Sequence, residues 1–412
     1  MTRAFRLSAL ILVLTSPTMP GAIQSAASAQ VQSPAQLQPS APAPVPEIPV
    51  WRRDTAQELL LYIEQVRQEG LDPSDYGPDR LRAAIAGDEA GLSPIATPIF
   101  LRLVSDLSGG AVRGRSRVDW HMTDSSLDAP GQQRLLAQVA RGGGVGAALD
   151  ALLPTHPQYA GLKRALAATP ESETARRDLI RTNMERWRWM PRTLGSRHVL
   201  VNVPAFTAAL VDDGRVTARH RAVVGAIRTP TPQLNATITG VTLNPWWHVP
   251  QSIIASQGGR FGAGYQVTRT AGGGISVRQP PGPRNALGRL KIEMPNHHAI
   301  YLHDTPSQAL FGRPVRAFSH GCIRTQNVRD FAALLLAPTG QWGRAEIDRG
   351  IDTGRNQSVA LAAPVPVYIA YFTAAATSDG DVVAYNDIYG RDGPVRQALN
   401  RGGRTRVEQA SN

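Results

Sequence analysis

The segment HDTPSQALFGRPVRAFSHGCIR, residues 303–324, carries Cys322, the only cysteine among 412 residues. A single cysteine cannot close an internal disulfide, and an odd cysteine indicates either intermolecular pairing or a reactive thiol. Free cysteine is often a buried core residue, but a buried strand would not carry the Ser-His-Gly of residues 319–321 directly before it. The glycine permits a tight turn, and Arg316 and Arg324 add positive charge that favours thiolate over thiol. These neighbours favour a reactive thiol over a structural one.

A thiolate nucleophile needs a base within hydrogen-bond reach. His320 lies two residues before Cys322, so both side chains point the same way in an extended stretch. His303 ends the strand-like run AIYLHDT, and a strand beside the SHGC loop would bring its imidazole to the sulfur. A zinc site of His303, His320 and Cys322 is an alternative, but the paired ligand spacings of zinc proteins are missing. A serine nucleophile lacks the GxSxG and SxxK patterns, so Ser319 is interpreted as a supporting group.

The N-terminal segment of the chain indicates export. The N-terminus has a short basic start, an apolar run too short to span a bilayer, and a small-residue cleavage pattern at 27–29. We therefore expect residues 1–29 to be a signal peptide, with an uncleaved anchor as the alternative, and no transmembrane segment in the mature chain. Residues 30–50 predict a Pro/Ala-rich, semi-rigid linker. For an exported chain, the formal net charge of +12 favours a wall polymer or membrane surface over nucleic acid as the partner.

The period of the apolar residues divides the rest of the chain into two parts. In DTAQELLLYIEQVRQEG, apolar residues recur every three or four positions; Asp54 can cap the start and Gly70 can end the helix. The sequence therefore predicts an α+β chain with a helical domain at 51–174. Further helices are expected at Ile95–Leu107, Gln132–Val139, Gly146–Leu153 and Ala175–Trp189.

The second part, residues 175–395, is predicted to be a mainly β domain. Its apolar residues alternate in short runs that Gly, Pro and Asp turns separate. Residues 251–279 are short and glycine-rich and predict a mobile lid or capping loop, and residues 396–412 are expected to form a disordered tail. Strands are expected at His198–Val203, Ala205–Val211, Val216–Val224, Ile238–Leu243, Ala299–His303 and Val365–Phe372.

The segment 303–324 resembles the signature of the L,D-transpeptidase catalytic domain (YkuD type): a histidine, a spacer, Ser/Thr-His-Gly-Cys, an apolar residue, and Asn or Arg. NMERWRWMP at 183–191, LNPWWHVP at 243–250 and RQPPGPRNALGRLK at 278–291 resemble the large periplasmic members, which place a helical scaffold domain before the catalytic domain. GLDPSDYG at 70–77 is similar to that scaffold. The resemblance implies a periplasmic protein.

The resemblance also implies a role for individual residues. Cys322 corresponds to the nucleophile and His303 to the general acid/base, while the backbone carbonyl of Asp304 corresponds to the group that orients His303. The loop whose amides stabilise the oxyanion falls on Ser319, His320 and Gly321. Substrate-binding candidates are Tyr301, Arg316, Arg324, Trp246 and Trp247.

The activity that the resemblance implies is peptidoglycan transpeptidation. The thiolate attacks a tetrapeptide stem, D-alanine leaves a thioester, and an amine of a second stem or of a protein completes the transfer, giving a 3–3 cross-link in the first case. No metal or cofactor is required, and a carbapenem would acylate the same thiol. The activity would contribute to cell-wall organisation and cell shape. Other expected partners are an outer-membrane lipoprotein or other wall enzymes.

Two alternatives remain open at this point. Water replacing the amine would make the protein an L,D-carboxypeptidase or endopeptidase, and an inactive wall-binding scaffold would keep the fold without the reaction. The chain departs from many large relatives because it has no room for a peptidoglycan-binding module before NMERWRW. The acceptor, the oligomeric state and the need for an activating partner stay undetermined by the sequence.

Overall fold

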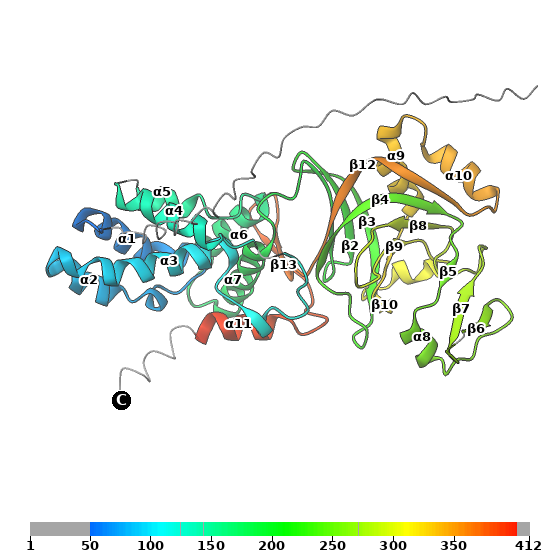
Figure 1. Cartoon of the computed structure of the whole chain (residues 1–412), viewed down its shortest axis with the longest axis horizontal. Coiled ribbons are helices and arrows are strands. Elements are labelled where there is room, and N and C mark those ends of the chain that lie inside the picture. The colour runs from blue at the N-terminus through cyan, green and yellow to red at the C-terminus, as the bar shows by residue number, and fades with distance from the viewer. Residues whose placement is uncertain (1–49, 124, 143, 271, 402–412) are drawn as a thin grey trace, which may run out of the picture. The chain divides into compact units, whose positions relative to one another are not determined.

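The computed structural model describes residues 50–123, 125–142, 144–270 and 272–401. The expected signal peptide and nearly all of the expected linker lie outside the described residues. The chain separates into two units, and everything below concerns the second, Ile48–Asn412. The α+β class predicted from the sequence is confirmed, because a helical region is followed by a mainly β region (Figure 1).

The helical region begins with α1, whose residues Leu59 and Ile63 lie on one face and are fully buried. That spacing of four gives an apolar stripe on one side of the helix. Asp72 accepts a hydrogen bond from the Ser74 amide at 3.0 Å and so caps the turn that follows. The elements are α1 (Arg53–Gln65), η1 (Val66–Glu69), η2 (Pro73–Tyr76), α2 (Pro78–Ala86), η3 (Glu89–Gly91), α3 (Ser93–Gly109), η4 (Gly114–Ser116), α4 (Ala129–Ala140), α5 (Val145–Asp150), α6 (Pro157–Ala168) and α7 (Thr174–Trp189).

Helix α3 is the central apolar helix of this region. By length and composition alone, Glu89–Ser116 could cross a membrane, but 56% of its most apolar window is buried inside the protein. Phe100, Leu103 and Leu107 of α3 are fully buried in the core that α1, α2 and α4 also line. The apolar surface of α3 is thus covered by the protein itself, as in the core helix of a globular domain.

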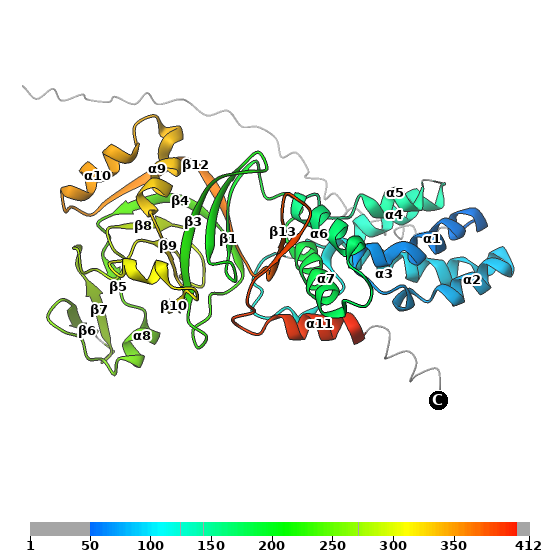
Figure 2. The same ribbon diagram turned by 180° about the vertical axis from the view of Figure 1, so that it is seen from behind.

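Helix α7 belongs to the helical region although the sequence placed it in the β domain. It is buried along its whole second half and packs on α6 and on the C-terminal helix α11 (Asp392–Arg401) (Figures 1 and 2). Glu185 and Arg188 are both buried and lie 2.7 Å apart. The helical region therefore extends to residue 189.

The β region is a nine-stranded sheet in the order β10-β3-β11-β9-β8-β4-β12-β1-β2. It closes on itself because β2 pairs with both β1 and β3. The expected strands are confirmed except Ala299–His303, of which only the last two residues are β-structure. The strands are β1 (Arg197–Asn202), β2 (Thr207–Asp212), β3 (Arg215–Gly225), β4 (Leu234–Leu243), β8 (Leu290–Glu293), β9 (Leu302–His303), β10 (Ala317–Ser319), β11 (Ile323–Thr325) and β12 (Gln357–Ala370).

One face of this sheet forms the main apolar core. Leu302, Ile323 and Ile292 point into it together with residues of the helices α9 (Val328–Leu336) and α10 (Arg344–Asp352). Side chains alternate between the two faces of a strand, so residues next to these core positions lie on the opposite face. Short 3-10 turns complete the region at η5 (Gln308–Gly312) and η6 (Ala337–Thr339).

Residues 251–279 were predicted to be a glycine-rich loop, and that prediction is wrong in part. They contain a helix and two strands, β6 and β7, and β7 pairs with both β6 and β5 in a separate antiparallel sheet of order β5-β7-β6. Val249, Ile254 and Val277 form its small core. We call this segment, residues 247–279, the flap. Its elements are β5 (Trp247–His248), α8 (Gln251–Ser256), β6 (Gln266–Arg269) and β7 (Ile275–Gln279).

The C-terminal part of the chain returns to the helical region. The hairpin of β13 (Ala374–Ala376) and β14 (Val382–Ala384) contacts α6 and α7, and α11 follows it. The sequence predicted a disordered tail from residue 396, but residues 396–401 form the end of α11, where Leu399 is buried. The rest of the expected tail lies outside the described residues.

Candidate active site

The neighbouring parallel strands β9 and β11 bring the sequence-predicted residues together. Leu302 pairs with Ile323 and His303 with Arg324. Since Leu302 and Ile323 point into the core, His303 and Arg324 share the other face, and Cys322 precedes β11 by one residue. The strand pairing predicted from the sequence is therefore found, with a strand of two residues, Leu302–His303, in place of the expected Ala299–His303.

The backbone before β9 turns sharply at Ala299, which has φ of +53°. A non-glycine residue in this region carries local strain of about 1 kcal/mol or more. Asn296 holds the turn, because its side chain accepts from the Ile300 amide and donates to the Ile300 carbonyl. The turn aims the Ala299 carbonyl at Cys322, whose Sγ lies 3.7 Å from that oxygen. This turn replaces the first residues of the expected strand.

The Cys322 thiol is partly buried. Burial raises its pKa, and hydrogen bonds from Tyr301 and the charges of Lys291 and Arg324 oppose that rise without cancelling it. The sequence predicted that Arg316 and Arg324 would favour the thiolate. In the structure, the charges that favour the thiolate are those of Lys291 and Arg324, and desolvation of the thiol outweighs their effect on its pKa. The thiol therefore needs a base to become a nucleophile at neutral pH.

His303 is 4% exposed, and its Nδ1 is hydrogen-bonded to the backbone carbonyl of Asp304. Burial, together with the charge of Arg324, lowers the pKa of His303 to about 3, although the carbonyls of Asp304 and Leu287 act in the opposite direction. The imidazole is thus neutral at pH 7. With Nδ1 donating its proton to the carbonyl, Nε2 carries the lone pair that a base requires.

The Asp304 side chain fixes the turn that precedes β8. Its Oδ2 accepts from the Arg289 amide at 2.9 Å, and its own amide donates to the Leu290 carbonyl at 2.8 Å. A Cβ on Gly288, which has φ of +64°, would lie 2.5 Å from the Asp304 side chain. The turn formed by NALG, residues 285–288, therefore needs this glycine. Asp304 is thereby held with its backbone carbonyl facing His303.

The loop before Cys322 is held by its own hydroxyl. Ser319 is buried; its Oγ donates to the Cys322 carbonyl and accepts from the Gly321 amide at 3.2 Å. Gly321 has φ of +110°, which only glycine adopts readily. The Gly321 amide, expected to stabilise an oxyanion, is already engaged by Ser319, while the His320 side chain is exposed.

Thr231 supports the same loop and was not found by sequence reasoning. It is fully buried; its hydroxyl donates to the Gly321 carbonyl and accepts from the Gly225 amide, both at 2.8 Å. No signal in the run RTPTP distinguishes this threonine from its neighbours. Its partner Gly321 lies 90 residues along the chain, so only the folded sheet shows its position.

A polar row crosses the sheet beside the thiol. Tyr301 hydrogen-bonds Cys322, and the Lys291 ammonium lies 4.7 Å from the Tyr301 ring centre. Lys291 also forms an ion pair with Glu293 at 2.8 Å. In the run LKIE of β8 the apolar residues face the core, which is the signal that could have identified Lys291 and Glu293.

The remaining substrate-binding candidates separate into two groups. Arg324 lies on the face of Cys322 and His303, and its buried Nε has no hydrogen-bond partner among the described residues. Trp247 of the flap hydrogen-bonds Tyr301. Trp246 instead packs under Arg278, whose guanidinium carbon lies 4.6 Å from the Trp246 ring centre. Arg316 donates hydrogen bonds to the carbonyls of Phe206, Ala222 and Arg313.

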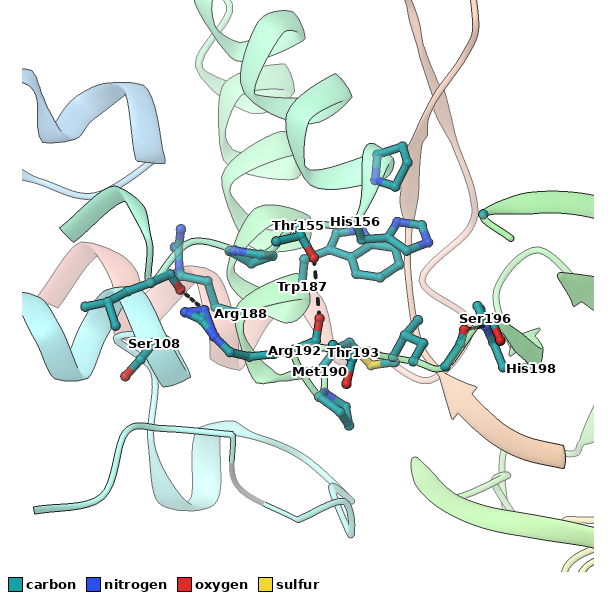
Figure 3. A pocket seen from close by; sticks show the side chains of 17 residues that line it. Ser108, Thr155, His156, Trp187, Arg188, Met190, Arg192, Thr193, Ser196 and His198 are labelled. Atoms are coloured by element: carbon teal, nitrogen blue, oxygen red, sulfur yellow. Dashed lines mark hydrogen bonds between the residues drawn. The ribbon is translucent and has the colours of Figure 1, made fainter. Parts of the chain in front are cut away.

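A cavity of about 320 Å³ lies elsewhere, between the end of α7 and the start of β1 (Figure 3). Trp187, His156 and His198 line it, and the Trp187 ring stacks on His156 at 4.1 Å. No residue of 303–324 lines this cavity, so it lies apart from the candidate site at Cys322. In the part of the chain that the structure describes, no three His, Cys, Asp or Glu side chains gather as metal ligands would.

Two family models match the chain, and together they define its class. Residues 196–367 match the L,D-transpeptidase catalytic domain, and residues 47–166 match the scaffold domain. The chain therefore has an L,D-transpeptidase catalytic domain preceded by a scaffold domain, which confirms the resemblance seen in the sequence.

Individual proteins are similar over part of their length. A Haemophilus influenzae protein named "Putative L,D-transpeptidase" is 28% identical over 225 residues, which cover 48% of this chain and 45% of that protein. This chain therefore spans less than half of that relative. An L,D-transpeptidase from Mycobacterium smegmatis is 15% identical, with 42% of this chain and 58% of that chain covered and a TM-score of 0.23. L,D-transpeptidase 3 from Mycobacterium tuberculosis with a faropenem-derived adduct is 15% identical, with 42% and 60% covered and a TM-score of 0.23.

Proposed function

We propose that this protein is a peptidoglycan L,D-transpeptidase that uses Cys322 as nucleophile and forms 3–3 cross-links. The observation that carries the proposal is the pairing of β9 with β11, which puts a neutral, oriented His303 on the face of the Cys322 thiol. A thiol and a neutral imidazole on adjacent strands are the two groups that acyl transfer requires. The family match of the catalytic domain supports the same activity.

The first half-reaction forms the thioester. His303 takes the thiol proton, and the sulfur attacks the carbonyl between the third residue of a tetrapeptide stem and its terminal D-alanine. The C–N bond breaks, and the proton moves from His303 to the departing D-alanine amine. Because the Gly321 amide donates to Ser319, we assign the developing oxyanion to the other two amides of the loop, those of His320 and Cys322, each donor contributing about 3 kcal/mol.

The second half-reaction transfers the acyl group. A primary amine of a second stem, or of a wall-bound protein, attacks the thioester carbonyl, the C–S bond breaks, and the amine proton returns to the sulfur through His303. Arg324, with its unpartnered Nε, is the group we assign to a carboxylate of the donor stem. We assign Trp247 and Tyr301, which hydrogen-bond each other on the flap side of the thiol, to contact with the donor stem.

Export to the periplasm is part of this proposal, because stem peptides are found outside the cytoplasm. The N-terminal pattern supports cleavage after residue 29. Cell fractionation with N-terminal sequencing of the recovered protein tests this point. A protein that keeps Met1 and stays in the cytoplasm would contradict it.

The activity test uses protein from residue 30 onward with a purified disaccharide-tetrapeptide, and mass spectrometry follows the products. A dimer that lacks one D-alanine is expected, and Cys322→Ala should lose it by more than about 10⁴-fold. Tripeptide alone would identify a carboxypeptidase. No product and no carbapenem adduct on Cys322 would contradict the proposed chemistry and favour an inactive wall-binding scaffold.

A further inference from the structure

A cavity of about 420 Å³ lies directly beside the loop that carries the nucleophile. His320 and Gly321 of that loop line it, as do His298 and Ile300 of the turn before β9. Gly321 precedes Cys322, and the carbonyl of Ala299, which lies between His298 and Ile300, is 3.7 Å from the Cys322 sulfur. The cavity therefore adjoins the thiol through both segments.

This cavity does not lie on the flap side of the thiol, where we place the donor stem. No residue of the flap lines it, whereas Tyr301 and Trp247 hydrogen-bond each other on the flap side of the thiol. A transfer reaction needs two substrates, and the second must approach the thioester from a space that the first leaves free. The cavity provides such a space.

The helical region supplies one wall of the cavity, through Val118 and Asp119. Backbone bonds fix this wall against the β region: His121 donates to the Gln233 carbonyl at 2.8 Å, and Gln233 donates to the Asp119 carbonyl at 3.0 Å. The Gln233 side chain also donates to the Val118 carbonyl at 2.9 Å. The scaffold segment is thus part of the cavity rather than a distant spacer.

The polar groups of the cavity are of two complementary kinds. The Asp119 carboxylate, 28% exposed, accepts from His121 at 2.9 Å and pairs with Arg391. The His298 and His320 side chains are exposed, and the buried Nη1 of Arg391 has no hydrogen-bond partner among the described residues. A carboxylate suits an ammonium group, and a guanidinium or imidazole suits a carboxylate.

We propose that this cavity binds the acceptor of the transfer, as a primary amine whose carbon also bears a carboxylate. Asp119 receives the ammonium, and Arg391 and the imidazoles receive the carboxylate. The ammonium loses one proton to solvent, its nitrogen attacks the thioester carbonyl, and its second proton passes through His303 to the sulfur, as in the proposed second half-reaction. The C–S bond breaks and the thiol regains a proton, so atoms and charge balance. This inference rests on the proposed function and adds to it a site for the second substrate.

The test compares two cavity variants of the full chain from residue 30, Asp119→Asn and His298→Ala, with the control Asp381→Asn. Asp381 forms an exposed ion pair with Arg176 of α7, away from the cavity. Each protein is given the disaccharide-tetrapeptide, and mass spectrometry gives the ratio of cross-linked dimer to tripeptide. The rate at which a carbapenem acylates Cys322 is measured beside it, because a merely structural defect would lower that rate.

Loss of one charge-assisted contact predicts a fall of about tenfold in the dimer-to-tripeptide ratio for Asp119→Asn. A smaller fall in the same direction is expected for His298→Ala, with the control and the carbapenem rates close to wild type. An unchanged ratio in both cavity variants would overturn the acceptor site. Equal losses of acylation and transfer would also overturn it, because they would show that Asp119 only supports the loop. A wild type that is not acylated at all would instead contradict the proposed function.

Discussion

Helix α7 and the β9–β11 pair each bury ionisable groups, but they treat them in opposite ways. In α7, Glu185 and Arg188 are fully buried and paired. Burial alone would raise the pKa of Glu185, but Arg188 and the hydrogen bonds from Val112 and Trp189 lower it overall. Both groups stay charged because each has its partners.

On the sheet, burial outweighs the effect of the nearby charges. It lowers the pKa of His303 and raises that of Cys322, so both groups are held neutral at pH 7. Neutral groups can exchange a proton with each other and with a substrate. A buried ion pair would lose its electrostatic attraction if one member changed its charge. The buried groups that stay charged in α7 are ion-paired and stabilise the fold. The buried groups that we assign to chemistry are instead kept neutral by desolvation.

Replacing the base should produce the largest effect. His303→Gln removes the lone pair that we assign to proton transfer, and we expect the rate of carbapenem acylation at Cys322 to fall by about 10²–10⁴-fold. His297→Gln, at an exposed position in the turn before β9, is the matched control and should keep the wild-type rate. Equal rates for the two variants would show that His303 is not the base.

Breaking the pair in α7 should cost stability. Glu185→Gln leaves the Arg188 charge buried without its counter-ion, and we expect a loss of about 3–5 kcal/mol in the free energy of unfolding. Chemical denaturation measures it. Glu64→Gln, in an exposed pair with Arg82, should cost less than about 1 kcal/mol. Similar losses for both variants would mean that burial does not distinguish the two pairs.

The depressed pKa of His303 predicts a pH dependence of stability. In the unfolded chain this histidine takes up a proton near its ordinary pKa of 6.5, whereas in the folded chain it does so only near 3. The unfolded state therefore binds more protons between these values, and stability falls as the pH falls. At pH 5 the loss from this group is about 2 kcal/mol. The His303→Gln variant should lose less stability on acidification than wild type, and an equal loss would contradict the assignment.

Support of the catalytic loop by Thr231 should give the smallest effect. Thr231→Val keeps the shape of the side chain but removes the hydroxyl that joins the Gly225 amide to the Gly321 carbonyl. We expect carbapenem acylation to slow by about tenfold, since a buried partner is left unpaired. Thr231→Ser should restore most of the rate. If valine and serine behave alike, the hydroxyl does not position the loop.

The sequence alone determined the class of the protein and predicted two residues of its candidate site. The helical period of 54–168, the alternation after residue 198 and the single cysteine within SHGC predicted an α+β chain with Cys322 and His303 at its site. These are local patterns, and local propensity and short motifs are written in contiguous residues. Local patterns did not predict the strands of the flap. Its sequence is glycine-rich, and its strands form only by pairing with one another across residues 247–279.

Only the tertiary structure decided what surrounds the thiol. Thr231, Lys291 and Asp119 come from three distant segments, and their positions depend on strand register and on backbone bonds between the helical and β regions. The direction of the pKa of Cys322 was likewise beyond the sequence: nearby arginines predicted a thiolate, but burial outweighs their charge. Desolvation depends on everything packed around a group, and that packing exists only in the folded chain.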